Sequence, residues 1–295
     1  MMGKLCALAL ALLLAGCATD VVYRPDQLIR VEHPAYVAEL VKPEAAGFGD
    51  RKARFVEGAW LLSLIPKASG ENVFYDNSVI PGYNTRGLPL EFLDAVPLGG
   101  DRFLRPGVGI VTREPGKGRF KDHVEERFPW YSEVEADATG TTVHFYQLAP
   151  RFYYYTRTVR FANASKLIVF EDELVNLGGP TLRSQIFLHP FFKVPDGAEP
   201  WCRVDSKPDF ANPDHPALPG QGASFFTTGK VPAGKAWFVC GAGKPLAALW
   251  VGNALEAGFW YEKHAGGDVF AVEPFVEIEA PPWKTCKWTW GIEIP

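Results

Sequence analysis

The sequence predicts an all-β protein built as one large antiparallel β-sandwich. Its 29 glycines and 25 prolines separate short apolar runs in which aromatic and β-branched residues dominate, and this is the pattern of strands joined by turns. No extended amphipathic helix is evident, and no repeat of about 20–50 residues indicates a propeller or solenoid. With 47% hydrophobic and 14% aromatic residues, the chain can bury a sizeable core.

The first residues of the chain are typical of an export signal. Lys4 precedes the apolar run Leu5–Leu14, which is shorter than the roughly 20 residues that a membrane-spanning helix needs, so we expect a signal peptide. The sequence Leu14-Ala15-Gly16-Cys17 resembles a bacterial lipobox, and this resemblance implies cleavage before Cys17 and diacylation of that cysteine. An ordinary signal peptide with an incidental cysteine is the alternative.

Three segments follow from this interpretation. Residues 1–16 are the expected lipoprotein signal peptide, residues 17–50 a lipid-anchored tether and lead-in that includes either a first strand or a short helix, and residues 51–295 the β-sandwich domain. Two acyl chains anchor a protein stably in a membrane. Because Ala18 does not resemble an inner-membrane retention signal, we expect a cell-envelope protein anchored to the outer membrane through Cys17.

The charge and the cysteines exclude several classes of function. The net charge is −4 and the lysines and arginines are scattered, so no basic face for nucleic acid is expected. After Cys17 the chain contains Cys202, Cys240 and Cys286, which lack C-x-x-C spacing, so we expect no zinc site. Because three is an odd number, at most one disulfide forms among them; packed free thiols are the alternative.

Three consecutive runs give the clearest strand pattern. Residues 153–161, 166–176 and 181–194 are joined by short polar turns, so we expect an antiparallel meander. Residues 142–147 alternate and predict a further strand, whereas residues 55–65 fit a strand or a helical turn equally well. In the third run, period-two alternation places side chains on opposite faces, with Ser184, Ile186 and Leu188 on one and Gln185, Phe187 and His189 on the other.

A resemblance to a known family rests on two motifs. The turn Leu174-Val175-Asn176-Leu177-Gly178 is followed by His189-Pro190-Phe191-Phe192. An L-x-N-x-G turn before a strand that delivers such a histidine is similar to the aldose 1-epimerase, or galactose mutarotase-like, superfamily. The resemblance implies the supersandwich fold of that superfamily over residues 55–294, with His189 as the acid that protonates the ring oxygen of a sugar. A core histidine bonded to a backbone carbonyl is the alternative.

The resemblance also implies a glutamate on a late strand as the base that removes the proton from the C1 hydroxyl. Glu273, which is followed by a proline, fits best, and Glu277 and Glu279 share its strand face if no bulge intervenes. The choice among these three glutamates stays open. For catalysis, the histidine and the glutamate should lie about 5–7 Å apart, with room for a pyranose, so that both reach one sugar.

Five further residues are expected to bind substrate. A pyranose packs its C–H face on aromatic rings, and arginines bind hydroxyl groups or a uronate carboxylate. For the arginines, surface salt bridges are the alternative. The five residues are Arg86, Arg105, Asn176, Phe191 and Glu277.

The sequence departs from the family in one respect. Well-studied mutarotases carry an N-x-x-x-x-L-H-G-type motif in their first half, whereas His123 and His144 here lack that glycine context. The first hypothesis is an aldose 1-epimerase-like mutarotase that acts on a sugar without a cofactor or metal. The alternatives are a non-catalytic surface lipoprotein that binds carbohydrate and, third, a polysaccharide lyase-like enzyme. The expected partners are a sugar or oligosaccharide and the membrane, with no nucleic acid and no obligate protein partner.

Overall fold

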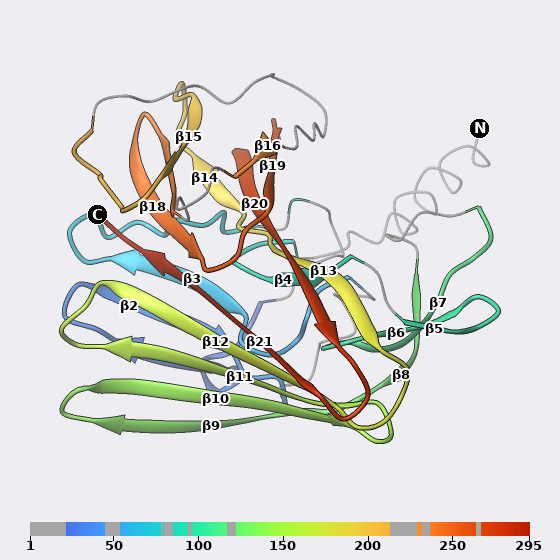
Figure 1. Ribbon diagram of the computed structural model, residues 1–295. Coiled ribbons are helices and arrows are strands. Elements are labelled where there is room, and N and C mark those ends of the chain that lie inside the picture. Colours follow the sequence, from blue (N-terminus) through green and yellow to red (C-terminus); the bar gives the residue numbers. More distant parts are fainter. Residues whose placement is uncertain are drawn as a thin grey trace, which may run out of the picture.

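A computed structural model describes residues 22–44, 54–77, 79, 85–93, 96–116, 122–212, 229–231, 237–263 and 267–295. The lipobox-like sequence and Cys17 lie outside these residues. In the described part of the chain the regular elements are strands, β1 to β21, and one 3₁₀ turn, η1 (Pro25–Gln27). The strands pair in antiparallel sheets (Figure 1), which confirms the predicted all-β fold.

The larger sheet has eight strands in the order β15-β17-β18-β21-β12-β11-β10-β9. Along β11 every second side chain is buried, because one face of the sheet packs on the core and the other faces solvent. The strands in sheet order are β15 (Pro200–Asp205), β17 (Trp237–Ala242), β18 (Lys244–Val251), β21 (Thr285–Glu293), β12 (Leu167–Asn176), β11 (Tyr153–Ala162), β10 (Gly140–Ala149) and β9 (Trp130–Asp137).

The second sheet has six strands; its strand β20 contains Glu273 and Glu277, and His189 directly follows its strand β13. Its order is β16-β19-β20-β13-β4, and β14 also pairs with β20. The central strand β20 is the longest in this sheet, and its residues 269–276 are all buried. The strands are β16 (Gly229–Lys230), β19 (Glu256–Glu262), β20 (Asp268–Ala280), β13 (Leu182–Leu188), β4 (Leu90–Phe92) and β14 (Phe192–Val194).

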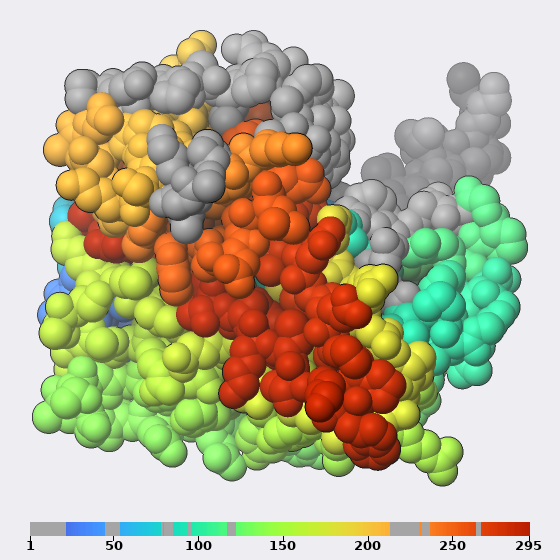
Figure 2. Space-filling view, in the orientation of Figure 1, coloured from blue at the N-terminus to red at the C-terminus, as the bar shows by residue number. Residues whose placement is uncertain are grey.

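The main hydrophobic core lies between these two sheets. Phe145, Tyr155 and Trp290 of the larger sheet belong to the same buried cluster as Ile186 and Phe270 of the second sheet. Packing of two antiparallel sheets over a shared apolar core defines a β-sandwich. In Figure 2 the C-terminal strands, in red, lie between the yellow-green strands of the larger sheet and the yellow segment that contains β13.

Two smaller sheets complete the described fold. The first contains β1 (Leu28–Glu32), β2 (Tyr36–Val41) and β3 (Leu61–Pro66), and the second contains β5 (Val96–Gly99), β6 (Arg102–Arg105), β7 (Gly109–Thr112) and β8 (His123–Arg127). Residues 29–40 supply side chains to the main core, so this part of the segment that we assigned to the lead-in folds with the domain. Within residues 55–65, the strand interpretation holds from residue 61 onward.

The predicted meander is correct for two strands and wrong for the third. Strands β11 and β12 pair as expected. Strand β13 pairs instead with β20 and β4, in the opposite sheet of the sandwich. A short polar turn can connect two strands of one sheet or two strands in different sheets. Here it connects β12 of the larger sheet to β13 of the second sheet.

Asn176 links the two sheets at this turn. Its side-chain amide donates to the carbonyls of Pro180 and Ala280, both at 2.9 Å, and its Oδ1 accepts from the N–H of Gly178 at 3.0 Å. The bond to Ala280, at the end of β20, ties the end of β12 to the second sheet. Gly178 has a φ of 97°, and a Cβ there would lie 2.2 Å from the Trp283 ring, so the turn requires glycine.

A buried group of polar side chains lies inside the larger sheet. Asp172 accepts hydrogen bonds from Arg157 Nε at 2.6 Å, from the Tyr155 hydroxyl at 2.8 Å and from Trp290 Nε1 at 2.8 Å. Arg157 also donates to the carbonyl of Gly58 at 2.8 Å. Arg157 and Asp172 are 1% and 2% exposed. Burial raises the pKa of the Asp172 carboxyl, and the Arg157 guanidinium opposes that shift.

Candidate functional site

His189 and Glu273 lie together on the face of the six-stranded sheet that points away from the main core. Ile186 and Leu188 of β13 face that core, so by alternation Phe187 and His189 face the other way. His189 follows the last residue of β13, and its backbone N–H donates to the carbonyl of Pro89 at 3.0 Å. We call this second surface of the sheet the site face.

Four cross-strand pairs between the β13 run and β20 line the site face in succession. No register shift interrupts the pairing of β20 with β13 or β19, so Glu273, Glu277 and Glu279 do share one face. The row runs from exposed to buried residues: Arg183–Glu279 at 2.9 Å, Gln185–Glu277 at 3.5 Å, Phe187–Phe275 with ring centroids 4.8 Å apart, and His189–Glu273 at 3.0 Å. These pairs confirm the predicted face of Gln185, Phe187 and His189.

The His189–Glu273 pair is closed and deeply buried. Its Nε2–Oε1 distance is 3.0 Å, which is shorter than the separation that we expected for two groups on opposite sides of a sugar. The two residues are 4% and 1% exposed. His189 Nδ1 and both carboxylate oxygens of Glu273 make no hydrogen bond in the described structure, so the 3.0 Å approach of Nε2 to Oε1 is a close contact without hydrogen-bond alignment. Buried polar atoms without hydrogen-bond partners are uncommon in proteins, and the two residues predicted to carry the chemistry contribute three of those found in the described structure.

Aromatic rings enclose the pair. The Phe191 ring stacks on the His189 imidazole with centroids 4.3 Å apart, and Trp260 and Phe55 approach it edge-on at 6.0 Å and 5.7 Å. Phe191, Trp260 and Phe55 belong to one hydrophobic cluster, separate from the main core. Apolar walls exclude water, so electrostatic interactions of the pair with any bound group are stronger there than in solvent.

A second buried ion pair, between Arg54 and Glu91, adjoins these rings; neither residue was expected from the sequence to belong to the site. Arg54 Nε lies 2.7 Å from Glu91 Oε2, and the Arg54 guanidinium lies 4.6 Å from the centre of the Phe55 ring. Glu91 is directly opposite Phe187 in the pairing of β4 with β13, which places it on the site face. The available signal was a single carboxylate between Leu90 and Phe92 in an apolar run.

The two predicted arginines have partners outside the His189–Glu273 pair, and Arg105 also interacts electrostatically with the Glu91 carboxylate of the site face. Arg86 donates to the carbonyl of Asp76 at 3.1 Å. Arg105 is 2% exposed and lies 2.8 Å from Asp122; burial lowers the pKa of its guanidinium, and the Asp122 carboxylate opposes that shift.

The other predicted substrate-binding residues divide between the site and the scaffold. Phe191 contacts His189 directly. Glu277 is exposed and lines a cavity of about 780 Å³ together with the other outer members of the cross-strand row. Asn176 is fully buried, and its amide group is used within the turn. The cavity is lined by Arg183, Ser184, Gln185, Glu277, Ile278 and Glu279.

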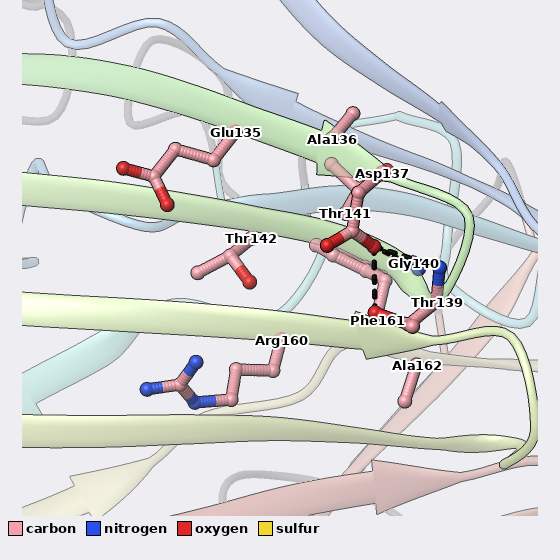
Figure 3. A pocket seen from close by; sticks show the side chains of 10 residues that line it. All are labelled: Glu135, Ala136, Asp137, Thr139, Gly140, Thr141, Thr142, Arg160, Phe161 and Ala162. Carbon is pink, nitrogen blue, oxygen red and sulfur yellow. Dashed lines mark hydrogen bonds between the residues drawn. The ribbon is translucent and has the colours of Figure 1, made fainter.

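A cavity of about 240 Å³ lies at the ends of β9, β10 and β11, beside the turn that joins β9 to β10 (Figure 3). The Asp137 carboxylate accepts hydrogen bonds from the hydroxyl and the N–H of Thr139 at 2.6 Å and 2.7 Å, and from the N–H of Gly140 at 3.2 Å. The hydrogen bonds from Thr139 lower the pKa of Asp137. All three hydrogen bonds lie within the β9–β10 turn. The Asp137 carboxylate therefore has a structural role in this turn, and we do not assign it a role in binding.

Neither a metal cluster nor a membrane-spanning helix is found in the described part of the chain. Within that part, no group of three or more histidine, cysteine, aspartate or glutamate residues is arranged to hold a metal ion. The described residues also contain no helix that is long and apolar enough to cross a membrane.

Comparison with known proteins identifies the class of fold. No protein-family model matches the sequence, and no curated protein is significantly similar to it. The structure nevertheless matches galactose mutarotase-like proteins, so the chain has the galactose mutarotase-like fold.

Three solved structures illustrate the match. A galactose mutarotase-like protein from Lactobacillus casei superimposes with a TM-score of 0.56 at 15% identity, over 91% of this chain and 100% of that one. The Slr1438 protein of Synechocystis gives 0.55 at 13% identity, over 94% and 99%. A galactose mutarotase-like protein from Clostridium acetobutylicum gives 0.53 at 10% identity, over 91% and 95%. At these identities the match establishes the fold.

Proposed function

We propose that this protein acts on carbohydrate and interconverts the anomers of a sugar at the His189–Glu273 pair. The observation that supports this proposal is the pair itself: a histidine and a glutamate 3.0 Å apart, buried among aromatic rings, with polar atoms that have no other partner in the described structure. A fold shared with galactose mutarotase-like proteins is consistent with this activity, although a fold alone does not define a function.

Anomer interconversion requires two proton transfers at one carbon atom. A base removes the proton of the C1 hydroxyl while an acid protonates the ring oxygen, so the C1–O5 bond breaks and the ring opens to the aldehyde. The aldehyde then rotates about the C1–C2 bond, and the reverse proton transfers re-form the C1–O5 bond to give the other anomer. Both oxygens are bonded to C1, so two groups that lie next to each other can each reach one of them. Glu273 takes the role of base and His189 that of acid, because a histidine carries and releases a proton near neutral pH.

The contacts favour Glu273 over the other two glutamates. Glu273 touches His189, whereas Glu277 and Glu279 are exposed and are paired with Gln185 and Arg183. In the structure the pair is covered, so a sugar reaches it only when the surrounding rings, Phe191 among them, move apart. The cavity beside Glu277 and Glu279 adjoins the exposed end of the same row, and the buried Phe187–Phe275 pair separates it from His189 and Glu273.

The closed pair also supports a second function. Because His189 and Glu273 touch each other, with no space for a pyranose between them, the chain could have the fold of a mutarotase without the chemistry. It would then be a carbohydrate-binding protein whose ligand occupies the exposed part of the site face. The absence of the second histidine motif in the first half of the sequence fits this alternative.

Exchange spectroscopy distinguishes the two functions. The wild-type protein is added to a panel of aldoses and uronates at anomeric equilibrium, and the rate of α–β exchange is measured by NMR. We expect exchange of at least one sugar to accelerate about 10²-fold or more over buffer, which is the range of acid–base catalysis by positioned side chains. Binding of a glycan without acceleration of any sugar would contradict the enzymatic proposal and support the binding protein.

We also propose that the protein is exported and anchored to the outer membrane through a diacylated Cys17. The support is the sequence alone: the short apolar run and the lipobox-like residues before Cys17. Globomycin, which inhibits lipoprotein signal peptidase, should then cause the uncleaved precursor to accumulate.

A further inference from the structure

Two of the three cysteines that follow Cys17 lie directly opposite each other on neighbouring strands. In the antiparallel pairing of β15 with β17, Cys202 is the register partner of Cys240. Strand β15 is the edge strand of the eight-stranded sheet. The two residues are 38 positions apart in the sequence, and we call the chain between strands β15 and β17 the excursion.

The register and the distance between the two sulfur atoms are compatible with a disulfide. The two Sγ atoms lie 3.7 Å apart, and both residues are buried, at 8% and 0% exposure. Residues directly opposite each other in an antiparallel pair have Cα atoms about 4.5 or 5.5 Å apart, and both values lie within the range of about 4.4–6.8 Å found in disulfides.

The third cysteine lies elsewhere. Cys286 is on β21, opposite Leu174 of β12, and is half-buried. It therefore does not compete for either partner in the folded protein and provides an internal control. Burial raises the pKa of the Cys240 thiol well above its ordinary value, so little thiolate is present at neutral pH while the pair is covered.

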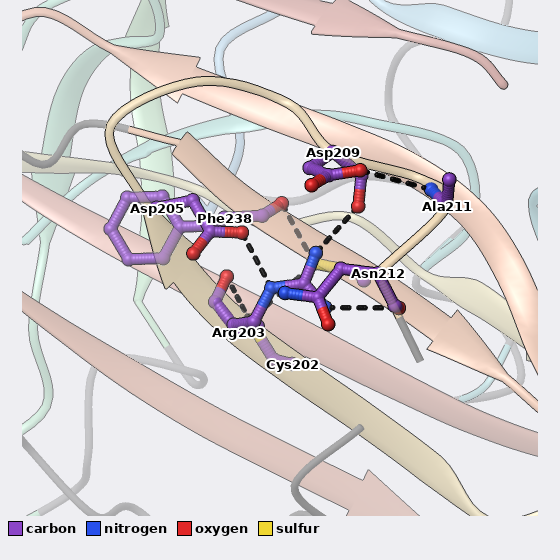
Figure 4. A network of polar contacts seen from close by, with 8 residues as sticks. Cys202, Arg203, Asp205, Asp209, Ala211, Asn212 and Phe238 are labelled. Carbon is purple, nitrogen blue, oxygen red and sulfur yellow. Dashed lines mark hydrogen bonds and ion pairs between the residues drawn. The ribbon is translucent and has the colours of Figure 1, made fainter. Parts of the chain in front are cut away.

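The segment after β15 is already fixed at one end by Arg203 (Figure 4). Its guanidinium lies 2.5 Å from Asp205 Oδ2 and donates to the carbonyls of Asp209 at 2.6 Å and Asn212 at 3.4 Å. These contacts hold the start of the excursion against the edge strand. A covalent link at the adjacent residue, Cys202, would attach that edge strand to β17.

We propose that Cys202 and Cys240 form a disulfide when the protein folds in an oxidising compartment. The oxidant is a disulfide, either oxidised glutathione or the disulfide of a thiol oxidoreductase. The thiolate of one cysteine attacks the donor disulfide and releases one thiol; the second cysteine then attacks the mixed disulfide and releases the other. Two protein thiols lose two electrons and two protons, and the donor disulfide is reduced to two thiols.

This proposal is independent of the carbohydrate function. Its consequence is structural, since a cross-link over a long excursion reduces the conformational freedom of the unfolded chain and prevents the edge strand from detaching. Exported proteins meet the oxidising conditions in which such bonds persist, and the predicted signal peptide would direct this chain there. The reaction takes place during folding or when β15 opens locally, because the folded pair is covered.

Peptide mapping of the purified protein tests the proposal. The protein is incubated with oxidised glutathione, its free thiols are blocked by alkylation in denaturant, and trypsin then releases residues 194–203 with Cys202, residues 236–263 with Cys240, and residues 285–287 with Cys286. We expect the first two peptides to be recovered as one linked species, lighter than their sum by two hydrogen atoms, and the third to carry glutathione or the alkyl group.

Thermal unfolding provides the matched control. Reduction should lower Tm by roughly 5–10 °C in the wild type and in Cys286→Ser, and should have no such effect in Cys240→Ala. Recovery of Cys202 and Cys240 as separate alkylated peptides or as separate glutathione adducts, or a link that includes Cys286, would overturn the proposal. The peptide map requires no variant, so it decides the matter even if Cys240→Ala fails to fold.

Discussion

Replacing Asp172 by alanine is expected to lower the free energy of unfolding by about 3–5 kcal/mol. The substitution leaves the Arg157 guanidinium as a buried charge without its counter-ion and removes the acceptor of both the Tyr155 hydroxyl and Trp290 Nε1. Each buried donor then loses the bond that compensated for its removal from water. Urea denaturation, followed by tryptophan fluorescence and by circular dichroism, measures the change.

A neighbouring residue on the same strand provides the control. Glu171 forms an ion pair with Arg160 at 2.8 Å, but the two side chains are 47% and 52% exposed, and exposed pairs contribute less than about 1 kcal/mol. Glu171→Ala should therefore leave the midpoint of unfolding almost unchanged. If Asp172→Ala lowered the free energy of unfolding as little as Glu171→Ala does, the buried polar group would not be important for the stability of this sheet.

Replacing Glu273 by glutamine is expected to reduce the acceleration of anomer exchange by about 10²–10⁴-fold, because the amide keeps the shape of the carboxylate but cannot accept the C1 hydroxyl proton. The same exchange measurement is made on Glu279→Gln, whose carboxylate lies on the same face but is exposed and paired with Arg183. That variant should retain the wild-type rate.

Stability measurements separate a catalytic loss from a structural one. Both glutamine variants should remain folded, which circular dichroism and the thermal midpoint verify. Full activity in Glu273→Gln would show that the base is a different group. Equal losses in Glu273→Gln and Glu279→Gln would indicate that the site face binds sugar through its carboxylates in general.

Alternation along the strands made much of the fold predictable. The period-two pattern of residues 182–189 placed His189 on the correct face, because each strand has one side on the core and the other turned away from it. The sheet that each strand joins was not predictable in the same way. At the crossing after β12, Asn176 donates a hydrogen bond to Ala280, a residue 104 positions away, and no local pattern encodes a contact at that distance.

The sequence suggested residues for the candidate site but not their geometry. The motif around His189 and the proline after Glu273 drew attention to these two residues, yet the direct contact between them arises from the register of β13 on β20, which the sequence does not display. Arg54 and Glu91 escaped notice because charged residues next to apolar runs are usually exposed, and their burial depends on each other. Arg105 shows the reverse case, since its partner Asp122 can only be recognised once the strands are placed.

The most direct test of the central claim is whether a sugar contacts His189. The protein is labelled with ¹⁵N-histidine, the imidazole signal of His189 is assigned by its loss in His189→Gln, and an aldose that the protein binds or interconverts is titrated. We expect the His189 signal to shift and saturate, while that of His144, which lies 3.2 Å from Thr158 on the larger sheet, stays in place. Saturable binding or exchange of the sugar with an unchanged His189 signal would contradict the assignment of the site.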